Sequence, residues 1–152
     1  IDDLPPCDDD SLTTGKGRTY QYFTGVPLYE FGYGLSYTTF KYGNMRASSD
    51  DKMVSVKFDV TNAGKRDGDE VVQLYVRYPE TGTHMPIKQL KAFRRLSLAK
   101  GEKQPVELTI DTADLRYWDD KTASFVTPKG KDQLMVGSSS ADIRLTTTIT
   151  LE

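Results

Sequence analysis

The clearest pattern in the chain is the alternation of apolar and polar side chains. Four apolar residues alternate with polar ones over 54–60, and the same period of two recurs over 70–78 and 104–110. Successive side chains of a strand point to opposite faces, so each segment is predicted to be a strand with one buried face. Less regular candidates are 38–47, 91–98, 123–126, 133–136 and 143–151. The sequence therefore predicts about eight short strands.

Turn-forming residues separate these segments, as in the Gly-Lys-Arg-Asp-Gly-Asp run of 64–69 and at Pro79. Only residues 112–117 offer a helical turn, and no long amphipathic helix is available to connect parallel strands. The pattern thus predicts an all-β fold, an antiparallel sandwich of about seven or eight strands packed in two sheets.

The first 35 residues differ from the rest. Residues 1–19 are acidic and rich in Pro and Gly, whereas 20–31 hold many aromatic side chains interrupted by Gly25 and Pro27. We therefore predict an extended N-terminal arm over 1–35 and a β-sandwich over 36–152. The arm is expected to have little regular structure in its first 19 residues.

Composition excludes several partners. The chain has 37% hydrophobic and 28% charged residues, and its formal charge of −2 is spread over both signs. We expect neither a nucleic acid nor a membrane as a partner, because no basic patch and no apolar run of roughly 20 residues is present. The single Cys7 and single His84 provide neither an internal disulfide nor a zinc site. No cofactor or metal is predicted.

No catalytic residue is predicted. General acid and base catalysis by carboxylates needs two of them at a fixed separation, but the clusters of acidic residues here lie in the polar arm or in turns. The turn over 67–70 lacks the order of acidic residues in a calcium loop. His84 has no serine or cysteine in a recognisable nucleophile motif.

Aromatic side chains are the remaining candidates for function. They could pack against another domain or stack on the apolar faces of sugars, and we favour packing because they lie beside Leu28 and other apolar residues. The candidate interface or sugar-contact residues are Arg18, Tyr20, Tyr22, Phe23, Tyr29, Phe31 and Trp118.

Five stretches resemble glycoside hydrolase family 3, the exo-acting β-glucosidases and β-xylosidases. In order along the chain, they are Gly17–Phe23, Pro27–Phe40, Gly68–Val76, Lys88–Arg95 and Val136–Leu145. The resemblance implies the C-terminal fibronectin type III-like domain of such an enzyme, preceded by a linker from its α/β sandwich domain. Family catalytic residues lie in that domain and in a barrel domain, so this chain is predicted to be inactive alone.

By this resemblance, the domain would brace the barrel and α/β sandwich domains of a parent polypeptide. That parent would hydrolyse glycosides with retention of configuration at the anomeric carbon. The parent would be periplasmic or secreted, as family members commonly are. A second hypothesis is a carbohydrate-binding module that holds polysaccharide near the active site through its tyrosines and Trp118. A third is dimerisation through sheet edges.

Overall fold

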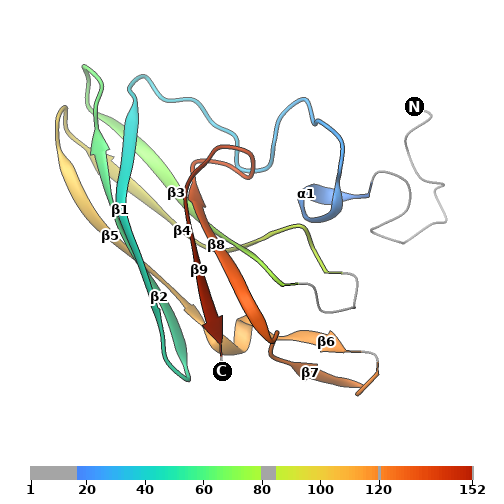
Figure 1. Cartoon of the computed structure of the whole chain (residues 1–152). Coiled ribbons are helices and arrows are strands. Elements are labelled where there is room, and N and C mark those ends of the chain that lie inside the picture. The colour runs from blue at the N-terminus through green and yellow to red at the C-terminus, as the bar shows by residue number, and fades with distance from the viewer. Residues whose placement is uncertain (1–16, 80–84, 120, 152) are drawn as a thin grey trace.

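Two antiparallel β-sheets pack face to face in the computed structural model, which describes residues 17–79, 85–119 and 121–151 (Figure 1). The strand orders are β1-β2-β5 and β4-β3-β8-β9, and β6 pairs with β7 in a separate hairpin. The bounds are β1 Phe40–Ser49, β2 Met53–Asn62, β3 Gly68–Arg77, β4 Gln89–Leu98, β5 Lys103–Asp111, β6 Tyr117–Asp119, β7 Ser124–Val126, β8 Gly130–Gly137 and β9 Ile143–Leu151. The predicted sandwich is confirmed, with seven described strands in its two large sheets.

The core lies between these sheets, where the predicted apolar faces meet. On β2 and β3 the alternating apolar side chains are almost completely buried, and burying one such side chain stabilises the fold by about 1.5–3 kcal/mol. These core residues are Val54, Val56, Phe58, Val60, Val72, Leu74 and Val76. The period of two therefore identified the inward face of both strands correctly.

The predicted helical turn after β5 is a 3₁₀ helix, η1 (Thr112–Leu115). The Asp111 side chain accepts a hydrogen bond from the Ala113 N–H at 2.8 Å, and Leu115, the last residue of the turn, is fully buried. The β6–β7 hairpin then projects from the sandwich (Figure 1). Strand β6 was not predicted, because its first residue falls in the segment expected to form a helical turn, whereas the equally short β7 lies within the predicted strand 123–126.

The arm enters through a short helix, α1 (Thr19–Tyr22), and then runs over one end of the sandwich to β1 (Figure 1). The helix was not expected from the sequence. Cys7, His84 and the acidic run of the first 16 residues lie outside the described residues, and the boundary between residues 35 and 36 stays a prediction. Among the described residues, no helix has the length and apolar character needed to span a lipid bilayer.

Candidate domain interface

Tyr20 attaches the arm to the outer face of the β4-β3-β8-β9 sheet. Its ring stacks on Phe31 with centroids 4.1 Å apart and meets the edge of Tyr75 at 6.1 Å. Its hydroxyl accepts a hydrogen bond from the Leu90 N–H at 2.9 Å. Tyr75 is fully buried although alternation places it on the face away from the core. The arm therefore forms a third layer over this part of the sheet.

Gln73 connects three segments at the centre of this layer. It is 4% exposed, and its Nε2 donates to the Gly32 carbonyl at 3.1 Å and to the Ser138 carbonyl. Its Oε1 accepts from the Tyr75 hydroxyl at 2.5 Å. A buried amide with its hydrogen bonds satisfied fixes a single arrangement of the groups around it. Gln73 thus sets where the arm and the β8–β9 connection lie.

Gly32 is required at this contact for two reasons. Its φ of +79° is unfavourable for residues with a Cβ. A Cβ there would also lie 2.2 Å from Oε1 of Gln73, closer than real atoms approach. Gly34 shows no such restriction, since a Cβ there would meet nothing within 4 Å. Of the two glycines that the sequence emphasised, Gly32 is the one that the arm needs.

Main-chain hydrogen bonds secure the arm at two further points. The Ile87 N–H donates to the Gln21 carbonyl at 2.6 Å, and the Ser140 N–H donates to the Phe31 carbonyl at 2.8 Å. Ser140 is itself held by Lys88, whose Nζ donates to the Ser140 carbonyl. Burial of the Lys88 side chain lowers its pKa. The arm is therefore held by specific polar contacts in addition to ring packing.

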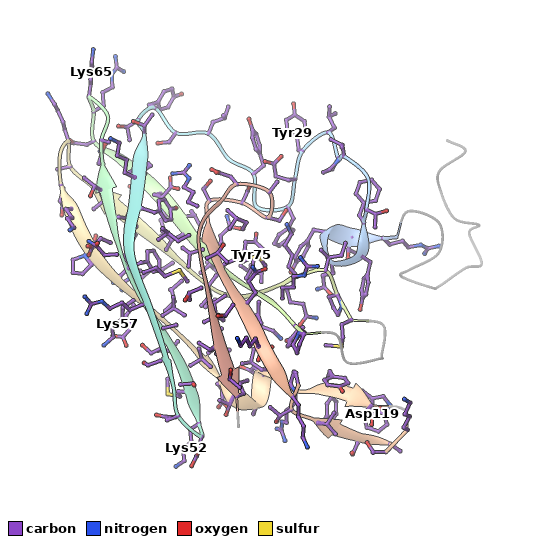
Figure 2. The ribbon with its side chains drawn as sticks, in the orientation of Figure 1. Tyr29, Lys52, Lys57, Lys65, Tyr75 and Asp119 are labelled. Atoms are coloured by element: carbon purple, nitrogen blue, oxygen red, sulfur yellow. The ribbon has the colours of Figure 1, made fainter. Side chains whose placement is uncertain are left out.

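The other side of the arm is exposed. Val26, Leu28, Leu35 and Tyr37 are each about nine-tenths or more exposed, and we call these four residues the outer strip. Figure 2 shows Tyr29 on the margin of the arm, whereas Tyr75 lies inside the molecule. An exposed apolar strip on a fixed segment is typical of a protein contact surface.

A polar network closes the end of the sandwich beneath the arm. The Tyr42 hydroxyl donates to Glu70 at 2.7 Å, while the Arg144 guanidinium lies over the Tyr42 ring and pairs with Asp142 at 2.7 Å. Burial raises the pKa of both Tyr42 and Glu70, and the hydrogen bond from Arg144 lowers the pKa of Asp142. The network joins β1, β3 and β9 and leaves the Arg144 charge compensated.

The sequence-predicted residues separate into two groups. Tyr20 and Phe31 are in contact, and Arg18, Tyr22 and Phe23 are half-buried in or beside α1. Tyr29 is 68% exposed and tilts against Tyr33 at 5.4 Å. Trp118 lies apart on β6, where it is half-exposed and meets Phe125 edge to face at 5.3 Å. The structure does not bring Trp118 together with the arm (Figure 1).

Sequence reasoning missed Gln73 and Tyr75, because alternation alone assigns them to a solvated face. One signal was available: residues 71–76 contain no charged side chain. A strand without charges on either face is typical of a strand covered on both sides.

No group of three or more His, Cys, Asp or Glu side chains in the described ranges is arranged to hold a metal ion.

Comparison with known proteins agrees with this architecture. The model of the fibronectin type III-like domain matches residues 70–140. A xylan 1,4-β-xylosidase of Xylanibacter ruminicola is 40% identical over 141 residues, which is 91% of this chain and 16% of the relative. A β-glucosidase of Bacteroides ovatus is 39% identical over 80% of this chain and 17% of its own length. The chain thus spans about a sixth of these curated relatives.

Solved structures give the same result. The β-D-glucoside glucohydrolase of Trichoderma reesei matches 84% of this chain with a TM-score of 0.79 and 37% identity, over 20% of its own chain. The β-glucosidase 3B of Thermotoga neapolitana, solved with α-D-glucose, matches 86% with a TM-score of 0.81 and 38% identity, over 18% of its own chain. The similarity again covers one part of a much longer polypeptide.

Proposed function

Because this chain belongs to the fibronectin type III-like domains at the C-terminal end of family 3 β-glucosidases and β-xylosidases, we propose that it is the non-catalytic part of a longer exo-acting β-glycosidase. Its main role is to brace the barrel and α/β sandwich domains of that parent. The parent hydrolyses glycosides with retention and is periplasmic or secreted.

The outer strip is the observation that carries this proposal. The arm is fixed on its inner side by Tyr20, Gln73 and the Phe31 carbonyl, so it cannot turn its outer apolar residues inward. Leu28 and Leu35 are 90% and 89% exposed. A neighbouring domain that covered them would gain about 25 cal/mol for each Å² of apolar surface removed from water.

The carboxylates of the described residues support a non-catalytic role. Asp59, Asp69 and Asp142 pair with basic side chains, and hydrogen bonds lower their pKa values. Burial raises the pKa of Asp132 to about 6, a value suited to a general acid, but its side chain is completely buried. We therefore place the catalytic carboxylates in other domains of the parent.

The test uses the parent enzyme purified from its source organism or expressed from its gene. Leu28→Ser with Leu35→Ser should lower the melting temperature of the catalytic domains, because the strip would no longer provide an apolar contact. The matched control is Phe125→Ser, which removes an exposed ring on the β6–β7 hairpin.

Activity on aryl β-glucosides and aryl β-xylosides is measured in parallel before and after mild heating. Faster heat inactivation of the double variant, with normal activity before heating, supports bracing. Equal melting temperatures and inactivation rates for wild type, double variant and control would contradict it.

A further inference from the structure

A groove of about 880 Å³ lies beside the docked arm. Its walls come from residues 30–40, from the first half of β3, from β4 and from the β8–β9 connection. Three aromatic rings line it and remain accessible: Phe31, Tyr33 and Phe93 are 45%, 47% and 68% exposed. This volume and this mixture of apolar and polar walls are typical of sites for small molecules.

Four carboxylates line the groove, those of Glu30, Asp69, Glu70 and Asp142, and they are hydrogen-bond acceptors. One oxygen of Glu30 accepts from the Ser139 hydroxyl at 3.3 Å, and one oxygen of Glu70 accepts from Tyr42 at 2.7 Å. Within the described part of the chain, the second oxygen of each carboxylate has no hydrogen-bond donor. Glu30 is half-buried and therefore retains capacity to accept a hydrogen bond from a ligand, whereas Glu70 is buried beneath the groove.

The charges of the groove exclude an anionic ligand. Among the described lining residues, Arg144 is the one cation, and Asp142 already pairs with it at 2.7 Å. Asp69 is likewise engaged by Arg95, whose Nε donates to it at 3.0 Å. An anion would therefore meet the Glu30 carboxylate without a compensating positive charge.

We infer that this groove binds a neutral saccharide. Pyranose hydroxyls can donate to the open oxygen of Glu30, while the apolar ring faces can lie on Phe93 and Tyr33. Phe93 is the principal platform, because its position opposite Gln73 places its ring on the same outer face that the arm leaves uncovered. The site is separate from Trp118, which lies on the β6–β7 hairpin.

This inference goes beyond bracing, which depends on the outer strip and needs no ligand. Leu35 of the outer strip also lines the groove, but Phe93 and Glu30, which the sugar test changes, lie outside the strip. Only the choice of probes rests on the proposed function. Cellotetraose is built from glucose and xylotetraose from xylose, the sugars whose β-glycosides the relatives are named for. Loss of heat resistance in the parent and loss of sugar binding in this chain are therefore separate results.

The experiment titrates the ¹⁵N-labelled 152-residue chain with each tetrasaccharide up to about 10 mM, a range that detects weak binding. Amide signals of residues 31–36, 69–73 and 93 are expected to shift. Phe93→Ala and Glu30→Gln should each weaken binding about ten-fold, whereas Trp118→Ala should leave it unchanged. Phe93 and Trp118 are exposed, so either ring can be removed without opening the core.

N-acetyl-arginine amide is titrated as a competing probe, because the groove is acidic. Shifts at the same amides with the arginine derivative and none with either sugar would assign the groove to a basic segment of a protein and overturn the inference. Sugar binding that survives Phe93→Ala but is lost in Trp118→Ala would overturn it as well, in favour of the hairpin. The absence of any shift with either sugar would also refute it.

Discussion

At the scale of single residues, buried polar side chains show how the arm is joined to the sandwich. Asn62 is completely buried at the end of β2, where the sequence suggests only a turn. Its Nδ2 donates to the Arg66 carbonyl at 2.8 Å and the Leu98 carbonyl at 3.0 Å. Its Oδ1 accepts from the hydroxyl of Thr38, in the segment that leads from the arm into β1, at 2.7 Å. One side chain thus joins this segment, the β2–β3 turn and β4.

Asn62→Ala is expected to destabilise the chain by about 2–4 kcal/mol, since the buried Leu98 carbonyl would lose its donor and Thr38 its acceptor. Thr38→Val removes only one of these hydrogen bonds and should cost about 1 kcal/mol. Urea unfolding followed by circular dichroism measures both. Equal losses in the two variants would contradict the central role of Asn62.

Asp132 is a different case, because it is completely buried and neither carboxylate oxygen has a hydrogen-bond partner. Burial raises its pKa to about 6. The negative charge of Asp132 in turn helps to raise the pKa of Tyr78. Above its folded pKa, Asp132 is an uncompensated buried charge, which costs free energy.

The pH dependence of stability follows from this shift. Between the unfolded value of 3.8 and about 6, the native state binds the extra proton, so the free energy of unfolding falls as pH rises. The loss amounts to about 2–3 kcal/mol by pH 7. Asp132→Asn should flatten the slope between pH 4 and pH 6, as measured by urea unfolding at several pH values. A slope equal to that of wild type would mean that Asp132 does not titrate in this range.

At the scale of elements, the arm converts an ordinary sheet face into an interior. Tyr75 and Gln73 of β3 are buried on the outer face because Tyr20 and Phe31 cover them. The outer strip is left exposed on the far side of the same segment. The arm is therefore a layer with two apolar sides, one occupied and one open.

Gly32→Ala is expected to release the arm for two reasons. The new Cβ would collide with the side chain of Gln73, and the positive φ of residue 32 is unfavourable for alanine. Stability should fall by more than about 1 kcal/mol, and trypsin should cleave faster after Arg18. Gly34→Ala is the matched control and should behave as wild type, because its Cβ would point into open space. Identical digestion of both variants would argue against arm docking through Gly32.

At the scale of the whole molecule, stability comes from the apolar core and the buried hydrogen bonds, while charge pairs lie at the surface. The described ion pairs are Lys57–Glu107, Arg95–Asp69, Lys103–Asp59 and Arg144–Asp142, and all but two of their side chains are more than a third exposed. Exposed pairs contribute little and are screened by salt.

Raising sodium chloride from low concentration to about 1 M, where the screening length is roughly 3 Å, should therefore leave the urea midpoint nearly unchanged. The measurement is made at pH 7 with the wild-type chain. A large fall in the midpoint would show that these pairs act together as a stabilising network.

The sequence by itself determined the strands, their inward faces and the antiparallel sandwich. A period of two is a local property, and burial of one face follows directly from it, as Val54–Val60 and Val72–Val76 show. The family resemblance was also readable, because its motifs are contiguous stretches. Strand β6 was not predicted, since its first residue lies in the segment assigned to a helical turn.

The tertiary structure alone decided how the arm and the sheet meet. Burial of Tyr75, the contacts of Gln73 and the groove beside Phe93 join positions about 40 or more residues apart in the sequence, from Gly32 to Gln73 and from Gln73 to Ser138. No local pattern records which segment covers an outer face. Those contacts form only when the chain folds back, because they depend on the shape and hydrogen-bonding groups of both surfaces together.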